Sequence, residues 1–174
     1  TTTYTGSYSG STYKMSFALD IPNRKLYVAR NGVWTNAKMY YTEEGDYIKA
    51  FSTYDGMATS LLKDKGIEIA ILTSENSKIV QERAKKLNIK YVYINEKEKL
   101  LRIKYLCNRL GISLDEVAYI GDDLNDLDVL KNVGISAMPI NSPILNQYAP
   151  DYVTKRAGGN GAFREFADLI LQHQ

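Results

Sequence analysis

From Tyr54 onward, the chain alternates between segments with helical periodicity and short apolar runs typical of buried strands. Alternating units of this kind fold into a parallel sheet with helices on both faces, and such sheets bind ligands at the carboxyl ends of their strands. The predicted fold class is therefore α/β. Helices are predicted at 54–66, 77–88, 98–111, 124–134 and 161–172, and strands at 67–73, 90–94, 116–123, 135–139 and 151–154.

The segment before this alternation has a different character. Residues 1–12 are rich in Thr, Ser, Gly and Tyr and carry no charge. Two strand-like runs follow between residues 13 and 34, on either side of a turn at Pro22-Asn23. A β-hairpin is predicted over residues 38–51, with its turn at Glu44-Gly45-Asp46.

A chain of 174 residues is long enough for one domain with a buried core, or for one domain and an extension. We expect an atypical extension over residues 1–23 and one α/β domain over residues 24–174. The formal net charge of +2 disfavours a polyanionic partner such as a nucleic acid. Because the sequence has no long apolar stretch and no signal-peptide pattern, we expect no contact with a membrane and a place in the cytoplasm.

The cysteine and histidine content limits the chemistry open to this chain. Cys107 is the single cysteine, which excludes an intrachain disulfide and any metal site built from several cysteines. His173 is the single histidine and lies near the C-terminal end, which argues against a catalytic triad or a histidine-ligated metal. Catalysis would therefore depend on carboxylates, hydroxyls and lysines.

Three carboxylates crowd the turn after the strand predicted at 116–123, namely Asp122, Asp123 and Asp126. Asp122 and Asp126 lie one helical turn apart, so their side chains can share a face. Oxygen ligands at a strand end suit Mg²⁺, which takes only one or two protein carboxylates. Helix capping is the alternative, since Asp at a helix N-terminus accepts hydrogen bonds from free N–H groups, although three carboxylates exceed what a cap requires.

Two other junctions between a strand and a helix carry candidate phosphate ligands. The hydroxyl of Thr73 can bind a phosphate oxygen beside helix N-terminal amides, and capping by Thr73 or Ser74 is the alternative. Lys99 can hold a phosphate as a point charge, or it can be a solvated surface lysine. The glycines of residues 157–166, AGGNGAFREF, allow a close backbone approach or form a turn before the last helix.

Taken in order, these stretches resemble the haloacid dehalogenase (HAD) superfamily, and within it the cap-less branch typified by 3-deoxy-D-manno-octulosonate 8-phosphate phosphatase. The C-terminal domains of CMP-sialic acid synthetases are similar. The resemblance extends from about Gly32 to Leu171 and implies a Rossmann-like fold and a Mg²⁺-dependent phosphatase of a sugar-acid phosphate. It rests on GVWTNAKMYYTEEGDYIKAFSTYDGM, GIEIAILTSENSKIVQERAKKL, VAYIGDDLNDLDVLKNVGISAMP and DYVTKRAGGNGAFREF.

The resemblance implies catalytic and metal-binding roles for single residues. Thr73 matches the second motif, which binds the transferring phosphoryl group, and Lys99 matches the third-motif lysine that stabilises its charge. Asp122 matches the acidic Mg²⁺ ligand of the fourth motif, with Asp123 and Asp126 in support.

The resemblance also implies a substrate-binding set and an oligomer. Asp55 lies in a loop that flanks the family's pocket. Glu75 stands where phosphatases of nine-carbon sialic-type sugar acids tend to have glutamate, which favours such substrates. Arg164 and the glycine-rich segment match a part of the family that reaches a neighbouring subunit's site. Family members are typically homotetramers in which a hairpin like that at 38–51 builds the interface, so self-association is expected.

The first motif departs from the family. Where the family has Asp-x-Asp-Gly-Val, this chain has Ala29-Arg30-Asn31-Gly32-Val33. The first aspartate of the family attacks phosphorus and binds Mg²⁺, and an alanine methyl group can do neither. The second aspartate moves a proton and offers its carbonyl to the metal; Asn31 keeps the carbonyl but cannot carry the proton. Impaired catalysis is therefore expected.

Residues 13–35 also resemble a strand pair of SPRY-like β-sandwich domains. Three hypotheses follow. In the first, the chain is a sugar-acid phosphatase with a damaged first motif. In the second, it is a non-catalytic HAD module for assembly or phospho-ligand binding, with Arg30 as a static phosphate partner and a link to a CMP-sialic acid synthetase pathway. In the third, it is a β-sandwich domain that binds a carbohydrate or a protein. The third hypothesis is the weakest, because the sandwich-like segment is too short to form two closed sheets.

Overall fold

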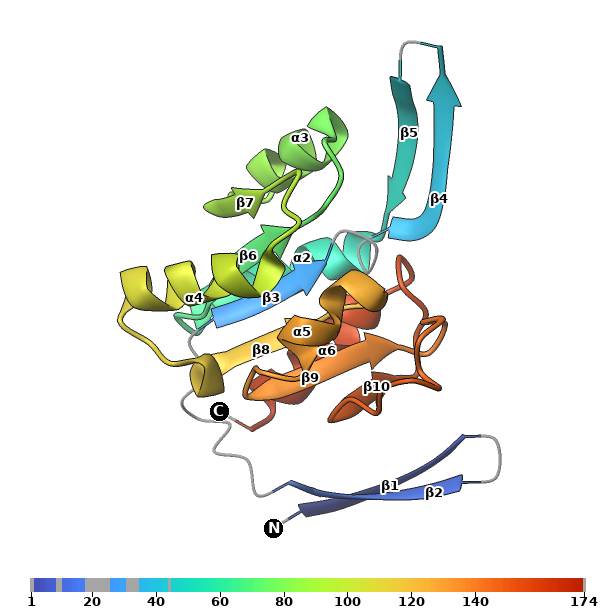
Figure 1. Ribbon diagram of the computed structural model, residues 1–174, viewed down its shortest axis with the longest axis vertical. Helices are drawn as coiled ribbons and strands as arrows, with labels where there is room; N and C mark the ends of the chain where they lie inside the picture. The colour runs from blue at the N-terminus through green and yellow to red at the C-terminus, as the bar shows by residue number, and fades with distance from the viewer. Residues whose placement is uncertain (1, 9–10, 18–25, 31–34, 44, 174) are drawn as a thin grey trace.

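The computed structural model describes residues 2–8, 11–17, 26–30, 35–43 and 45–173. Its centre is a six-stranded parallel sheet with helices on both faces, which confirms the predicted α/β fold class (Figure 1). Two separate antiparallel strand pairs complete the sheet structure of the described residues.

The order of strands in the parallel sheet is β10-β9-β8-β3-β6-β7. From β3 the chain moves outward through β6 and β7 on one side, and β8, β9 and β10 then extend the sheet on the other side. The order therefore reverses between β3 and β8, and open α/β sheets bind ligands at such a switch point. The strands span Leu26–Arg30 (β3), Glu68–Leu72 (β6), Tyr91–Tyr93 (β7), Val117–Ile120 (β8), Ile135–Pro139 (β9) and Tyr152–Thr154 (β10).

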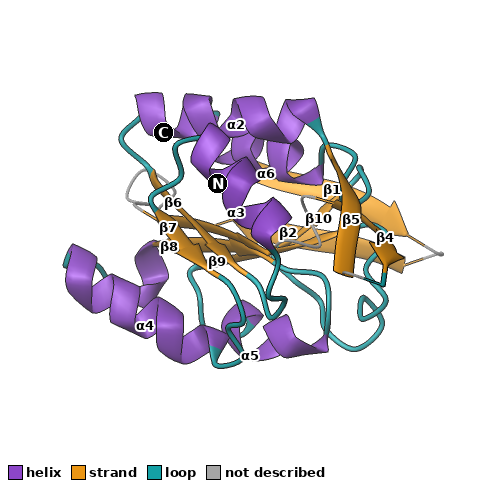
Figure 2. Cartoon of the chain, turned by 90° about the horizontal axis from the view of Figure 1, so that it is seen from above, coloured by secondary structure: helices purple, strands orange, loops and turns teal. Residues whose placement is uncertain are grey.

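Helices cover both faces of this sheet. Figure 2 shows α2, α3 and α6 over one face and α4 and α5 over the other. The glycines predicted to end two helices do so, because Gly66 and Gly111 adopt the positive φ angles that other residues rarely take. The helices span Thr53–Asp64 (α2), Lys78–Lys86 (α3), Lys99–Leu110 (α4), Leu127–Leu130 (α5) and Ala162–Leu171 (α6), with 3₁₀ turns at Leu114–Glu116 (η2) and Leu124–Asp126 (η3).

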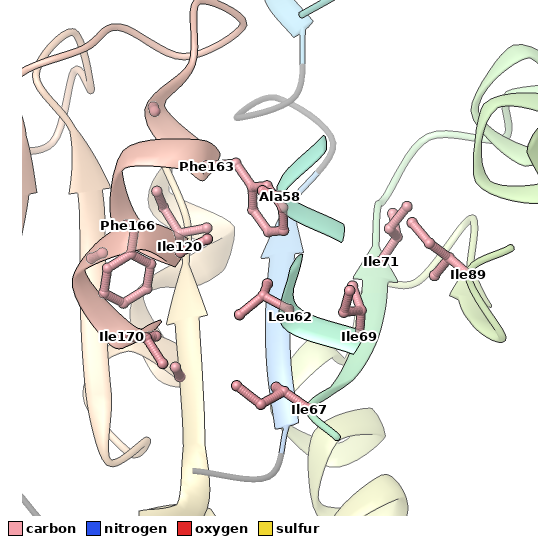
Figure 3. Close-up of a cluster of buried hydrophobic side chains, with 14 of the residues drawn as sticks. Ala58, Leu62, Ile67, Ile69, Ile71, Ile89, Ile120, Phe163, Phe166 and Ile170 are labelled. Carbon is pink, nitrogen blue, oxygen red and sulfur yellow. The ribbon is translucent and has the colours of Figure 1, made fainter. Parts of the chain in front are cut away.

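The core follows the alternation of side chains along each strand. In β6, Ile69 and Ile71 join the cluster under α2, α3 and α6 (Figure 3), whereas Ala70 and Leu72 join the cluster under α4 and α5. A strand buried on both faces reads as a continuous apolar run, which is why β6 and β8 were predictable from sequence. The helix predicted at 124–134 is shorter, since only η3 and α5 form there.

The N-terminal strands pair differently from the prediction. Thr2–Tyr8 (β1) pairs with Ser11–Phe17 (β2) in antiparallel fashion, and β3 pairs in parallel with β6 and β8. The two strand-like runs of residues 13–35 therefore do not form a SPRY-like pair, because the second run is a central strand of the α/β sheet. The turn predicted at Pro22-Asn23 and the domain boundary after residue 23 lie outside the described residues, and the boundary stays a prediction.

The predicted hairpin is present as Thr35–Thr42 (β4) and Gly45–Phe51 (β5), and it projects from the sheet in Figure 1. Thr42 pairs with Gly45, so the turn comes earlier than predicted, and Gly45 and Asp46 belong to β5. In the part of the chain that the structure describes, no helix has the length and apolar character needed to span a membrane.

Candidate active site

Three strand ends meet at the middle of the parallel sheet. Ala29 of β3 pairs with Ile71 of β6 on one side and with Ile120 of β8 on the other. Thr73 directly follows β6, and Asp122 follows β8 after a single glycine. The structure thus places Thr73 and Asp122 on either side of the strand that carries Ala29. Of the first motif, Ala29 and Arg30 lie in β3, and residues 31–33 lie outside the described residues.

A buried ion pair joins α4 to the turn after β8. The Nζ atom of Lys99 donates to Oδ1 of Asp126 at 2.5 Å, and the two residues are 2% and 0% exposed. The alternative reading of Lys99 as a solvated surface lysine is therefore wrong. A buried lysine requires a partner of opposite charge, and Asp126 supplies it.

Asp126 accepts hydrogen bonds from four donors of the described chain. The Tyr119 hydroxyl shares Oδ1 with Lys99, at 2.5 Å, and the backbone N–H groups of Asp122 and Asp123 donate to Oδ2 at 3.0 and 3.1 Å. Gly121 permits this approach, since a Cβ atom there would lie 2.7 Å from Cβ of Asp126 and 2.8 Å from Cε1 of Tyr119. The Asp126 carboxylate thus holds Lys99, Tyr119 and the turn after β8 together.

Thr73 is 2% exposed and held on three sides. Its N–H donates to the Tyr93 carbonyl at 2.9 Å, its carbonyl accepts from the Glu96 N–H at 2.8 Å, and Oγ1 accepts from the Glu75 N–H at 3.2 Å. The next helix begins after Ser77. The alternative that Thr73 or Ser74 caps this helix is therefore wrong.

The two adjacent aspartates have different environments. A side-chain oxygen of Asp123 accepts from the Leu124 N–H at 2.8 Å, so Asp123 caps η3, as the capping alternative predicted. Asp122 is half-buried, and its carbonyl accepts from the Ser142 hydroxyl at 2.8 Å. Within the described residues no group of three acidic, histidine or cysteine side chains is placed to share a metal ion. A single carboxylate at a strand end still fits Mg²⁺, which keeps most of its waters in proteins.

Glu75 forms an ion pair with Lys49, a residue of the hairpin that is 7% exposed. The carboxylate side of this pair is 41% exposed, so Glu75 faces the surface beside the end of β6. Lys49 ties the hairpin to the loop that carries Thr73 and Glu75. Lys49 could not be predicted from the sequence, because a lysine in an amphipathic hairpin gives no sign of the loop that it contacts.

Asp55 lies in the first turn of α2 and not in the predicted loop, and its carboxylate binds the glycine-rich segment. It is fully buried, and its carboxylate accepts from the backbone N–H groups of Gly161 and Arg164 at 3.3 and 2.8 Å. Gly161 precedes α6 with φ +94°, so the Asp55 carboxylate caps a helix that has no side-chain cap of its own. The Arg164 guanidinium pairs with Asp168 at 2.7 Å along the helix surface. Direct substrate contacts by Asp55, Glu75 and Arg164 stay predictions.

The burial of Asp55 gives a prediction for the pH dependence of stability. Desolvation raises the pKa of Asp55 above its usual 3.8, although the N–H groups of Arg164 and Gly161 lower it. The folded chain then binds this proton more tightly than the unfolded chain, so the contribution of Asp55 to stability is full below pH 3.8 and falls as pH rises through the raised pKa. The free energy of unfolding in urea, measured from pH 3.8 upward through the raised pKa, should fall with pH in the parent by an amount that is absent in Asp55→Asn. The same pH dependence in both would contradict the assignment.

The chain is similar in sequence to one family of hydrolases. Residues 15–134 match the haloacid dehalogenase-like hydrolase family. The 3-deoxy-D-manno-octulosonate 8-phosphate phosphatase KdsC of Salmonella typhi is 37% identical over 164 residues, which cover 94% of this chain and 86% of that enzyme.

Solved structures show the same relationship. The phosphatase of Moraxella catarrhalis, crystallised with magnesium, phosphate and KDO, superposes with a TM-score of 0.84 at 37% identity, over 88% of this chain and 89% of the other. The cobalt-bound enzyme of Haemophilus influenzae gives 0.84 at 35% identity, over 88% and 91%. The Yersinia pestis enzyme gives 0.85 at 32% identity, over 99% and 94%. The chain therefore belongs to the haloacid dehalogenase-like hydrolases, in the family of the 3-deoxy-D-manno-octulosonate 8-phosphate phosphatases.

Proposed function

We propose that this chain binds the phosphate ester of a sugar acid at the ends of β3, β6 and β8 and that its hydrolytic turnover is severely impaired. The observation that carries the proposal is the place of Ala29. This residue lies in the central strand, paired with β6 and β8. By the resemblance of the first motif, the attacking carboxylate of the family would stand at this position. Its side chain has no atom that can attack phosphorus or bind a metal.

The relatives favour one substrate class. They are named as phosphatases of 3-deoxy-D-manno-octulosonate 8-phosphate, and we propose the same sugar-acid phosphate as the first candidate ligand. Glu75 supports a second candidate, the 9-phosphate of a nine-carbon sialic-type acid, because it stands where phosphatases of that class tend to have glutamate. Its exposed position beside the end of β6 is compatible with contact to the sugar part of either ligand.

Thr73 and Lys99 would bind the phosphate directly, and Asp122 would bind it through a metal ion. The Thr73 hydroxyl would donate to a phosphate oxygen, and the Lys99 ammonium, which has three N–H donors, would bind phosphate while retaining Asp126. Asp122, with Asp123 and the Asn31 carbonyl, would hold Mg²⁺. The cation would neutralise phosphate charge when bound, and the loss of a ligand at position 29 is expected to weaken its affinity.

Hydrolysis needs two groups that this chain lacks at the expected positions. Ala29 supplies no nucleophile, and the Asn31 amide cannot take a proton from water or give one to the leaving alcohol. A bound phosphate ester would therefore remain intact for much longer than in the relatives.

The second candidate function is that of a non-catalytic module for assembly or for binding a phosphorylated ligand. The hairpin and the start of α2 expose large apolar side chains at Ile48, Tyr54 and Met57, which are 49%, 63% and 56% exposed. We propose that these residues contact further copies of the chain in a homotetramer, which the molar mass in solution tests. In this function Arg30 would be a static phosphate partner.

Phosphate affinity tests the binding site itself. Thr73→Val keeps the volume of the side chain but removes its hydroxyl, so we expect inorganic phosphate to bind about tenfold more weakly, the effect of one hydrogen bond to a charged group. Thr73→Ser keeps the hydroxyl and should bind phosphate as the parent does. Isothermal titration calorimetry with Mg²⁺ present measures both. Equal affinity in all three proteins would contradict the proposed role of Thr73.

A further inference from the structure

The hydroxyl of Tyr119 donates to the Asp126 carboxylate, which pairs with Lys99. Tyr119 lies in β8 and is fully buried among the side chains under α4 and α5. Its hydroxyl donates to Oδ1 of Asp126, the same oxygen that accepts from Lys99, and both distances are 2.5 Å. A tyrosine in a core needs some partner for its hydroxyl, and a backbone carbonyl would serve. Here the partner is a buried carboxylate.

We propose that Tyr119 is a positioning residue for Lys99, acting through Asp126 on the binding of phosphate; this inference rests on the proposed function. Two donors on one oxygen divide its negative charge between them. The hydroxyl of Tyr119 thereby limits how strongly Asp126 holds the Lys99 ammonium, so the positive charge of Lys99 remains effective toward a phosphate at the strand ends.

The geometry around Asp126 supports this role. Oδ2 is fixed by the N–H groups of Asp122 and Asp123, so the carboxylate cannot rotate to compensate for a donor lost from Oδ1. Without the hydroxyl of Tyr119, the charge of Oδ1 would act more strongly on Lys99, and the ammonium would be held closer to the carboxylate. The consequence is weaker phosphate binding, although Tyr119 itself touches no ligand.

Tyr119→Phe tests the inference, because it removes the hydroxyl and retains the packing of the ring. We expect inorganic phosphate to bind more weakly to Tyr119→Phe than to the parent, by up to about tenfold, because the effect passes through Asp126 and a direct charge-assisted hydrogen bond sets its upper limit. The matched control is Tyr148→Phe, which removes the hydroxyl that donates to the Leu130 carbonyl at 2.9 Å. This control should lose stability without losing phosphate affinity.

Calorimetric titration of the full chain with inorganic phosphate gives the affinities, and the ¹⁵N resonance of the Lys99 ammonium reports its environment directly. A shift of that resonance in Tyr119→Phe but not in Tyr148→Phe supports the inference. Unchanged phosphate affinity in Tyr119→Phe, with the parent binding phosphate, would overturn this inference alone. Absence of phosphate binding by the parent would overturn the proposed function and this inference together.

Discussion

Restoring both aspartates of the first motif, by Ala29→Asp with Asn31→Asp, is expected to raise the rate of phosphate release from 3-deoxy-D-manno-octulosonate 8-phosphate by about 10⁴–10⁶. Position 29 lies in the central strand, beside the strands that lead to Thr73 and Asp122, so a carboxylate there would meet the proposed phosphate site. The nucleophile and the proton-transfer group act as a unit, so neither substitution alone should restore full activity. Steady-state phosphate release with Mg²⁺ measures the effect.

The two single variants are the matched controls for this experiment. Asn31→Asp alone restores a proton carrier without a nucleophile and should remain near the parent rate. Ala29→Asp alone restores the nucleophile and a metal ligand, and should give a smaller increase than the pair. If the double variant has no activity while it binds phosphate, the defect extends beyond the two side chains and the account of the first motif is wrong.

Removing Asp126 is expected to have the largest effect on stability. Asp126→Ala removes the carboxylate that pairs with the buried Lys99 ammonium and that accepts from Tyr119 and two backbone N–H groups. Breaking a buried ion pair in this way costs about 3–5 kcal/mol. Lys99→Met should cost less, because Asp126 keeps its other donors. Urea unfolding of the two variants and of the double variant gives the free energies.

The double variant should lose less stability than the sum of the two single losses. Each single variant buries a charge that has lost its counter-charge, and the double variant buries neither charge. The pair of Arg164 and Asp168 provides a control. Its side chains are 30% and 41% exposed, and an exposed pair one helical turn apart contributes less than about 1 kcal/mol. Additive losses for Lys99 and Asp126, or a loss for Asp126→Ala no larger than for Asp168→Ala, would contradict the described network.

Much of the fold could be predicted from sequence because it depends on local patterns. The continuous apolar runs of β6 and β8 indicated strands buried on both faces. Gly66 and Gly111 indicated helix ends, because glycine readily takes the positive φ angles that the structure shows there. The pairing of the N-terminal strands could not be predicted in the same way. A strand next to a turn suggests a hairpin, but whether β3 pairs with its chain neighbour or enters the parallel sheet depends on partners more than thirty residues away.

The candidate site shows the same division. Sequence order and strand ends were enough to single out Thr73, Lys99 and Asp122. The contacts of Tyr119 with Asp126 and of Lys49 with Glu75 could not be predicted, because the sequence pattern around each residue is that of an ordinary core strand or hairpin. Asp55 was expected at the edge of a pocket, and the structure adds a role that depends on a helix over a hundred residues later in the chain. Contacts of this range have no local signal.

We expect the chain to bind a phosphate ester and to lack the groups that hydrolyse it. The most direct test follows one sample of the native chain with Mg²⁺ and 3-deoxy-D-manno-octulosonate 8-phosphate, first by calorimetry and then by the phosphate that it releases. We predict heat of binding and a phosphate release about 10⁴–10⁶-fold slower than that of the double variant with Ala29→Asp and Asn31→Asp. Turnover of about 1 per second or faster, the usual range of enzymes, would contradict the claim.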